Sequence, residues 1–512
     1  MVSKLSPGST REPILKEGDT CWRKVRAERV AFIVDAADYF EAAKDAILKA
    51  ERCVYLIGWE FDLEVRLCPE ADDPDIPDQL RLFLQYVAEE RPDLEIFVLQ
   101  WRGAMMFNVA RQLGSFLLLK ASAKPQIHFR LDGEHPPGGC HHQKIVVIDD
   151  VLAFCGGIDM TSGRWDNSRH RSGNPSRGEE GDRPMPWHDM TLALEGDAAK
   201  ALGELARQRW KNATGNDLPV PSRKDSIWPE TIDPDLRDAV VGIARNSPKY
   251  KDNPQISEIE NLWCNAIASA RRTIYIENQF LSSGKIADAL KAKLQEEDGP
   301  DIAIVLPCSA ESWLESEAMD TRRSLIVIDL READRNGRLG VYHPVNEAGE
   351  PIYVHAKLLI VDDDFVRVGS SNMASRSLSS DTECDLAMET ADQPELREVL
   401  IRLRTQMIAE HLGLSMDAVT AELEKSDGRI HSVIERLRYK NGRTLEVLKP
   451  RELNDTEMAM AQSRLLDPEE PIALSRRVAD FAHKAFQQNR GVIAIAGMTA
   501  AGWAARQFVR RR

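Results

Sequence analysis

The sequence lacks a long hydrophobic run, a paired cysteine motif and an excess of positive charge. Its longest mainly apolar stretch, Gly491–Ala505, is shorter than the roughly 18–20 residues that a membrane-spanning helix needs. The eight cysteines include no C-x-x-C pair and mostly lie beside apolar, strand-like runs, so we expect reduced thiols in the core and a cytoplasmic protein. A net charge of −15 disfavours binding of nucleic acid through a broad basic face, although a local cationic cleft is compatible with it.

The two ends of the sequence bear on where the protein acts. Residues 1–19 contain no apolar signal-peptide core, which supports the cytoplasmic assignment. Near the other end, Arg490 and the segment RQFVRRR flank the apolar stretch with positive charge. Such a tail either packs against the body of the protein or rests on an anionic membrane surface, and both alternatives stay open.

Internal similarity organises most of the remaining chain. The β-rich runs at 52–62 and 272–282 each follow an amphipathic helix with apolar residues at helical spacing. The distance from the tyrosine in each run to the histidine of a later shared motif is 87 residues in the first copy and 80 in the second. This agreement in order and spacing predicts a duplicated unit.

The alternation of helices with buried apolar strands predicts an α/β fold with two pseudo-symmetric halves, each a mainly parallel sheet between helices. The first half spans residues 1–212 and contains a polar insertion at 164–186 that has no counterpart in the second half, which spans 213–415. We expect residues 416–512 to form a helical extension that ends in the apolar tail. Nothing in this extension indicates chemistry.

Two copies of a H-x-K-x-x-x-x-D motif mark equivalent points of the two halves. The first reads CHHQKIVVIDD and the second VHAKLLIVDDD. On a strand, residues i and i+2 share a face, so His142 and Lys144 point together, as do His355 and Lys357. One copy is weak evidence, but two copies at matching positions, each followed by a Gly-Gly or Gly-Ser turn, point to function.

Two histidines and two lysines that converge form a cationic pocket suited to a phosphate diester. The lysines neutralise phosphoryl oxygens, one imidazole attacks phosphorus, and the other protonates the leaving oxygen. The rival is a metal site, with ligands from His141, His142, Asp149, Asp159, His188 and Asp189. We disfavour it and expect no metal ion or cofactor, because each motif histidine shares its strand face with an ammonium group that opposes metal binding.

Carboxylates recur at matching positions in both copies. Asp149 and Asp362 fall at the strand ends with the opposite parity, so we expect structural ion pairs or turn contacts from them rather than catalysis. A working imidazole needs an acceptor on its second ring nitrogen. Glu383 and Asp189 begin matching strands downstream of the two motifs and are the candidates for this role.

Polar residues also follow the motifs in a shared register. Ser370 and Asn372 lie 15 and 17 residues after His355, and we expect both to bind the substrate phosphate. Asp159 stands at the position equivalent to Asn372 in the first copy. An ionised carboxylate cannot donate a hydrogen bond to phosphate, so we expect Asp159 to hold a lysine instead.

These residues resemble the phospholipase D superfamily, whose mark is the paired H-x-K-x-x-x-x-D motif. Finer segments are similar to its phosphatidyl-transferring branch, among them GWEFD, GGIDMTSGRWD, PWHD, IYIENQF and GSSNMASRS. The resemblance covers residues 18–415 and implies two α/β halves around one site. It also implies that His142 becomes the phosphohistidine and that His355 acts as acid and then base. The family commonly has asparagine where this chain has Ala374, which removes one polar contact.

The resemblance implies a metal-independent phospholipase D that hydrolyses glycerophospholipids or transfers their phosphatidyl group to an alcohol. A cardiolipin synthase-type phosphatidyltransferase is the closest alternative, disfavoured because such enzymes usually carry N-terminal membrane helices. A superfamily nuclease or phosphodiesterase is disfavoured by the acidic charge, and a non-catalytic lipid-binding protein by the intact His-Lys pairs. As partners we expect a glycerophospholipid, water or an alcohol, and a membrane surface, but no nucleic acid, with the site complete in a monomer.

Overall fold

The computed structural model describes residues 12–71, 75–104, 124–178, 184–222, 225–310, 319–438, 442–454, 458 and 467–468. The apolar C-terminal tail therefore lies outside the described residues, together with its expected packing or membrane contact. Within the described ranges, no helix combines the length and apolar character needed to cross a bilayer. All eight cysteines are described, and each is a free thiol.

The strands fall into two sets that follow each other along the chain. The first set is β1 (Arg23–Val34), β2 (Cys53–Gly58), β3 (Glu95–Trp101), β4 (Ile127–Asp132), β5 (Ile145–Ile148), β6 (Leu152–Gly156), β7 (Trp187–His188) and β8 (Met190–Glu195). The second set is β9 (Leu236–Ser247), β10 (Ile256–Ser257), β11 (Thr273–Glu277), β12 (Asp301–Val305), β13 (Leu339–Val345), β14 (Tyr353–Val354), β15 (Leu358–Val361), β16 (Phe365–Gly369), β17 (Glu383–Glu389) and β18 (Thr444–Val447).

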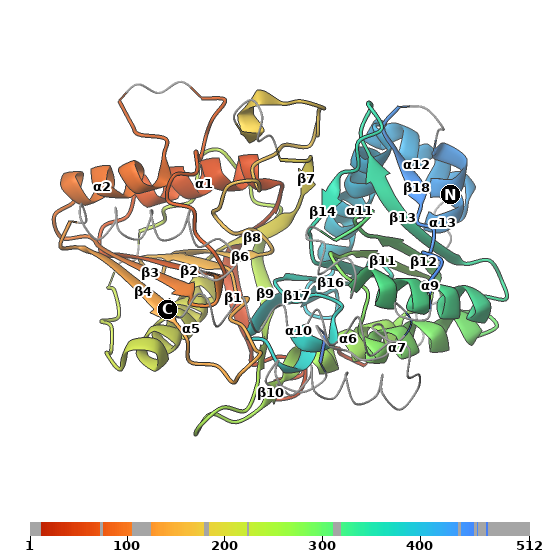
Figure 1. The fold of residues 1–512 in the computed structure, drawn as a ribbon, viewed down its shortest axis with the longest axis horizontal. Coiled ribbons are helices and arrows are strands. Elements are labelled where there is room, and N and C mark those ends of the chain that lie inside the picture. Colours follow the sequence, from red (N-terminus) through yellow and green to blue (C-terminus); the bar gives the residue numbers. More distant parts are fainter. Residues whose placement is uncertain are drawn as a thin grey trace.

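Among the described residues, one continuous 16-stranded sheet runs through the protein (Figure 1). Its order is β4-β3-β2-β5-β6-β8-β1 in the first half, followed by β9-β17-β16-β15-β11-β12-β13-β18, with β10 paired to β9. Apart from β10 and β18, the second half repeats the first in reverse order. The two halves are therefore related by a pseudo-twofold symmetry, as the duplicated sequence predicts.

The expected α/β class is confirmed, and the sheet is mixed. Parallel pairing is found in the outer strands of each half, β2-β3-β4 and β11-β12-β13, where the expectation of a parallel sheet holds. The strands nearer the centre pair antiparallel. The cause is local, because β5-β6 and β15-β16 are hairpins with turns of a few residues, and such turns join antiparallel neighbours only.

Helices cover both faces of the sheet (Figure 1). In the first half these are α1 (Ala36–Leu48) and α2 (Leu80–Glu90) on one face and α5 (Asp197–Thr214) on the other. In the second half they are α6 (Glu258–Ser269), α7 (Gly284–Gln295) and α9 (Thr321–Ala333) on one face, and α11 (Leu396–Leu412), α12 (Met416–Lys425) and α13 (Ile430–Leu437) on the other, with the short α10 (Ser375–Ser379) near the centre. One core cluster includes residues of both α5 and α11, so the halves share hydrophobic packing.

The seam between the halves is the antiparallel pair β1-β9, which runs from Arg23 opposite Ile243 to Val30 opposite Leu236. Val30, Leu236 and Ile243 are buried in the shared core. Because this seam is a hydrogen-bonded ladder, the two halves are held at a fixed position relative to each other.

The C-terminal extension contains α12 and α13, as expected, and also a strand that the sequence did not indicate. β18 pairs antiparallel with β13 at the end of the sheet, with Leu445 fully buried. The four-residue run is too short to give a periodic signal, and it becomes a strand because the edge of β13 offers unpaired backbone groups.

Candidate active site

The two motifs occupy equivalent places just before β5 and β15. His142 and Lys144 lie in the extended segment that leads into β5, and His355 and Lys357 precede β15 in the same way. In each copy the lysine ammonium donates to the carbonyl oxygen of the motif histidine, at 3.0 Å for Lys144. The shared direction of histidine and lysine therefore follows from extended backbone, although the residues stand ahead of the strands and not within them.

The motif aspartates build the turns that follow. Asp149 and Asp362 have φ angles of 54° and 55°, and the next residue of each turn is also left-handed. Short polar side chains tolerate this region best. The carboxylate of Asp149 accepts the backbone N–H groups of residues 51–53, and that of Asp362 accepts those of residues 271–273, at 2.7–2.8 Å. Both aspartates thus fix the motif hairpin to the start of the neighbouring strand.

Each motif histidine contacts a carboxylate from the other half. Nδ1 of His142 lies 3.0 Å from Oε2 of Glu383, and Nδ1 of His355 lies 2.6 Å from Oδ2 of Asp189. Both acids are fully buried. The sequence places each acid downstream of the histidine in its own copy, so this exchange between halves is a result that sequence order did not reveal.

Backbone contacts bring about the exchange. The backbone N–H of His142 donates to the carbonyl of Thr382 at 2.8 Å, and that of His355 donates to the carbonyl of His188 at 2.7 Å. The short parallel pair β7-β14 supports the second contact. The segment before each motif therefore pairs with the segment before the opposite acid, which sets the register between ring and carboxylate.

The two lysines have different partners. Lys144 Nζ lies 3.0 Å from Oδ2 of Asp159, the kind of contact that the sequence predicts for Asp159. Lys357 Nζ donates to Oε1 of Gln279 at 3.3 Å. In the second half, Asn372 stands at the position that Asp159 occupies in the first. Lys357 therefore contacts the neutral amide oxygen of Gln279, whereas Lys144 contacts a negatively charged carboxylate.

The predicted phosphate-binding residues differ in placement. Ser370 is fully buried, and its hydroxyl donates to Oε2 of Glu383 at 2.5 Å. Its carbonyl oxygen lies 3.0 Å from Nδ1 of His142. The hydroxyl is therefore turned to the buried acid, and the predicted contact of Ser370 with the substrate phosphate stays a prediction. Asn372 is 4% exposed, and its Oδ1 has no hydrogen-bond partner among the described residues.

Burial and crowded positive charge favour the neutral forms of the basic groups. Burial, followed by Lys144 and Lys357, holds the pKa of His142 well below its ordinary value. Burial and then Lys357, Arg164 and Lys144 do the same to the pKa of His355. Burial also lowers the pKa of Lys357 to about 7. The site is thus poised to accept negative charge.

Sequence reasoning did not single out Arg164 or Gln279. Arg164 lies over the ring of Trp187, 4.0 Å from the centroid, and its charge acts on His355. Trp187 stacks on Tyr353 at a centroid distance of 4.5 Å, two residues ahead of His355. The signal was present, because GGIDMTSGRWD, PWHD and IYIENQF contain Arg164, Trp187 and Gln279, but side-chain direction inside such segments is set by tertiary contacts.

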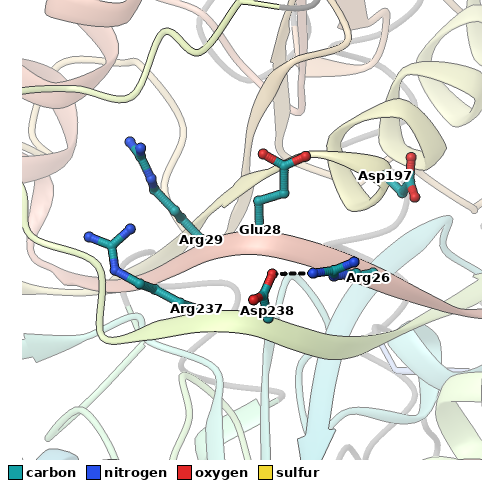
Figure 2. Close-up of a pocket in the computed structure, with 6 residues that line it drawn as sticks. All are labelled: Arg26, Glu28, Arg29, Asp197, Arg237 and Asp238. Atoms are coloured by element: carbon teal, nitrogen blue, oxygen red, sulfur yellow. Dashed lines mark hydrogen bonds and ion pairs between the residues drawn. The ribbon is translucent and has the colours of Figure 1, made fainter.

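The residues considered as a metal site do not converge. His141 pairs with Asp132 at 3.0 Å, Asp159 with Lys144, and Asp149 with backbone amides. A surface pocket of about 360 Å³ elsewhere contains none of the motif residues. It lies along β1 and β9 and is lined by Arg26, Glu28, Arg29, Asp197, Arg237 and Asp238 (Figure 2). These opposite charges face one another, as in the Arg26–Asp238 ion pair, so the pocket offers no unbalanced charge to a ligand.

Comparison with known proteins agrees with this geometry. Residues 263–403 match the family model described as "Cardiolipin synthase, PLD-like domain". The chain is 26% identical to "Phospholipase D A" of Dictyostelium discoideum, covering 75% of this chain and 36% of that protein. It is 24% identical to "Phospholipase D2" of Bos taurus (77% and 53%) and 23% identical to "Phospholipase D alpha 1" of Carica papaya (74% and 64%). The chain thus spans about a third to two thirds of the length of these relatives.

A solved structure shows the same fold. The phosphatidylserine synthase of Haemophilus influenzae superposes with a TM-score of 0.51 and 14% identity, covering 81% of this chain and 96% of that one. The paired motifs, the duplicated sheet and the sequence matches together make the chain similar to members of the phospholipase D superfamily.

Proposed function

We propose that the protein is a phospholipase D that cleaves the head-group bond of glycerophospholipids through a phosphohistidine on His142. The observation that carries the proposal is the exchange of Glu383 and Asp189 between the halves, which gives each motif histidine a buried carboxylate on Nδ1. The acids thereby direct Nε2 of both rings toward the reacting phosphate. The names of the relatives support the substrate class.

The proposed first step uses His142 as the nucleophile. The carbonyl of Ser370 can only accept, so its contact with Nδ1 fixes the proton there and leaves the lone pair on Nε2. Nε2 attacks phosphorus, the P–N bond forms, and the P–O bond to the head group breaks. His355 gives its proton to the departing oxygen. The negative diester offsets the surrounding positive charges and so raises the pKa of His355 on binding.

The proposed second step reverses these roles. Neutral His355 takes a proton from water or an alcohol, whose oxygen attacks phosphorus and displaces His142. Water gives phosphatidate, and an alcohol gives a new phosphatidyl ester. Lys144 and Lys357 neutralise the phosphoryl oxygens in both steps, with Asn372 as a further contact. All these groups belong to one chain, which supports a monomeric enzyme.

We expect the activity to fall at alkaline pH because Lys357 loses its charge. Its pKa of about 7 means that Nζ is protonated below this pH and neutral above it. For a soluble diester, the fall of kcat/KM with rising pH should therefore become steeper above pH 7, because loss of the Lys357 charge adds to loss of the proton that His355 donates. In Lys357→Arg the guanidinium stays charged, so the descending limb should move up by about one unit or more.

Lys144→Arg is the matched control for the pH profile. It keeps the positive charge next to Lys357, so the pKa of Lys357 should not change and the descending limb of the pH profile should stay near pH 7. A wild-type profile that is flat from pH 6 to pH 9, or an unshifted limb in Lys357→Arg, would remove Lys357 from the phosphate site.

The defining experiment incubates purified protein with phosphatidylcholine vesicles and ethanol. Mass spectrometry should detect phosphatidate and phosphatidylethanol, and both should be absent with His142→Ala. His128→Gln, whose partially exposed ring pairs with Glu95 away from the site, should behave as wild type. Failure to convert any glycerophospholipid, with cleavage of a single-stranded oligonucleotide instead, would turn the assignment to a nuclease.

The matched family model favours a second candidate, a phosphatidyltransferase of the cardiolipin synthase type. It would use the same phosphohistidine with a lipid alcohol as acceptor. With phosphatidylglycerol as the sole lipid, this enzyme would release glycerol and form cardiolipin in preference to phosphatidate. The ratio of the two products decides between the candidates.

A further inference from the structure

A buried group of histidines and carboxylates lies between the halves, and the mechanism above does not use it. We call it the interhalf cluster: Asp35 before α1, His170 in the polar insertion, His188 in β7 and Glu410 on α11. The side chains are 0–5% exposed. One ligand atom from each residue lies within 4.8 Å of all the others. Because the sequence gives the insertion a polar composition, nothing in the sequence indicated that His170 is buried.

Carboxylates outside the cluster fix both imidazole rings. Nδ1 of His170 lies 3.0 Å from Oδ2 of Asp166, and Nε2 of His188 lies 2.7 Å from Oε2 of Glu277. When the rings are neutral and the outer nitrogen of each donates its proton to this carboxylate, the inner nitrogen, Nε2 of His170 and Nδ1 of His188, presents a lone pair. A carboxylate on the far nitrogen is the arrangement that orients histidine ligands of metal ions.

Three of the distances between the inner atoms are close to the edges of a small tetrahedron. Nε2 of His170 lies 3.1 Å from Oε1 of Glu410 and 3.6 Å from Oδ2 of Asp35, and Nδ1 of His188 lies 3.0 Å from Oε1 of Glu410. Zinc–ligand bonds of about 2.0–2.1 Å give tetrahedron edges of about 3.3 Å. Neither Oδ2 of Asp35 nor Nδ1 of His188 makes a hydrogen bond of good geometry in the described part of the chain, although Nδ1 lies at ion-pair distance from Glu410.

The charges around the cluster do not balance when the histidines are neutral. Within the described ranges, four carboxylates face two guanidinium groups here: Asp35, Asp166, Glu277, Glu410, Arg177 and Arg443. Two negative charges remain, which either one divalent cation or two extra protons would neutralise. Protonated rings leave Oδ2 of Asp35 without a hydrogen-bond partner, whereas a cation at the centre uses this oxygen as well as both rings.

We propose that the interhalf cluster binds one divalent cation and that two imidazole nitrogens with two carboxylate oxygens select Zn²⁺. Four protein ligands close the coordination sphere, which is the pattern of a structural site. The ion ties the polar insertion and the first half to α11 of the second half. It also supports the catalytic face, since Oδ1 of Asp35 accepts the backbone N–H of Asp189 at 3.2 Å.

The test measures the metal directly, in full-length protein expressed with added zinc and dialysed against metal-free buffer. We expect about one Zn²⁺ per chain by mass spectrometry and, by X-ray absorption, a shell of two imidazoles and two oxygens at about 2.0–2.1 Å without sulfur. His170→Gln should lower the zinc content at least about tenfold. His128→Gln is the matched control and should keep full occupancy.

Several outcomes would overturn the site. Wild-type protein that stays free of zinc, even after Zn²⁺ is added back, would indicate that the cluster holds two protons. Zinc retained in His170→Gln, or a shell that contains sulfur, would place the metal elsewhere. If His170→Gln does not fold, the wild-type content and absorption spectrum still decide. These readouts need no turnover, so the result stands apart from the proposed lipid chemistry.

Discussion

His142→Ala is expected to be inactive on every phosphodiester, whereas His355→Ala should keep slow phosphoryl transfer from an activated one. Without the nucleophile no P–N bond forms, and the loss should reach roughly 10⁴-fold or more. Without the acid, a choline or ethanolamine head group cannot leave, but p-nitrophenolate leaves unaided. The measurement is release of nitrophenolate from a p-nitrophenyl phosphodiester beside turnover of phosphatidylcholine.

The same variants should reveal the intermediate. His355→Ala also lacks the base that activates water, so label from the diester should accumulate on the protein as acid-labile phosphohistidine at position 142. His128→Gln, with an unaltered site, should turn over without trapping label. Label at His355 in His142→Ala would exchange the two roles, and absence of label from both variants would contradict the covalent mechanism.

The exchanged acids lead to a second prediction. A variant of each acid should affect activity in the same way as a variant of the histidine in the opposite half. Asp189→Asn should weaken the proton transfer by His355, since no other acceptor contact to its Nδ1 is described. Turnover of natural lipid should fall on the order of 10³–10⁴-fold, with the nitrophenyl diester largely spared. Glu383→Gln should slow both substrates equally, on the order of 10²-fold, because Ser370 still holds the Nδ1 proton of His142.

The control for this prediction is a comparison of how much each acid variant slows turnover of natural lipid and of the nitrophenyl diester. If acids served the histidines of their own halves, Asp189→Asn would affect both substrates and Glu383→Gln would spare the activated one. Circular dichroism and thermal unfolding should match wild type in both variants, since each replacement is isosteric. Equal rates to wild type in either variant would remove that residue from the site.

Features that depend on local sequence could be predicted. The paired motifs, the duplicated order of elements and the lysine contact of Asp159 follow from periodicity, spacing and charge. The sequence predicts the turn aspartates, Asp149 and Asp362, at strand ends for the same reason. The structure adds which strand each aspartate contacts, because their carboxylates accept hydrogen bonds from the backbone of residues 51–53 and 271–273.

Features that depend on how distant segments meet could not be predicted. The exchange of Asp189 and Glu383 exists because β1 and β9 join the halves, a contact between segments some two hundred residues apart. The hydroxyl of Ser370 turns inward because Glu383 is buried beneath it. His170 lies in a segment whose polar composition indicates a solvated loop, yet buried carboxylates from both halves surround it.

The exchange across the seam has a consequence for ancestry. A single half cannot supply the carboxylate of its own histidine, so an ancestral unit of this size would have been active only as a homodimer, with the seam as the subunit boundary. Fusion of two such copies would free each copy from serving both positions, which is consistent with the differences now present: Asp159 against Asn372, and an insertion in one copy alone. A gene encoding only residues 12–222 should therefore need a second chain to regain a complete pair of histidine and acid.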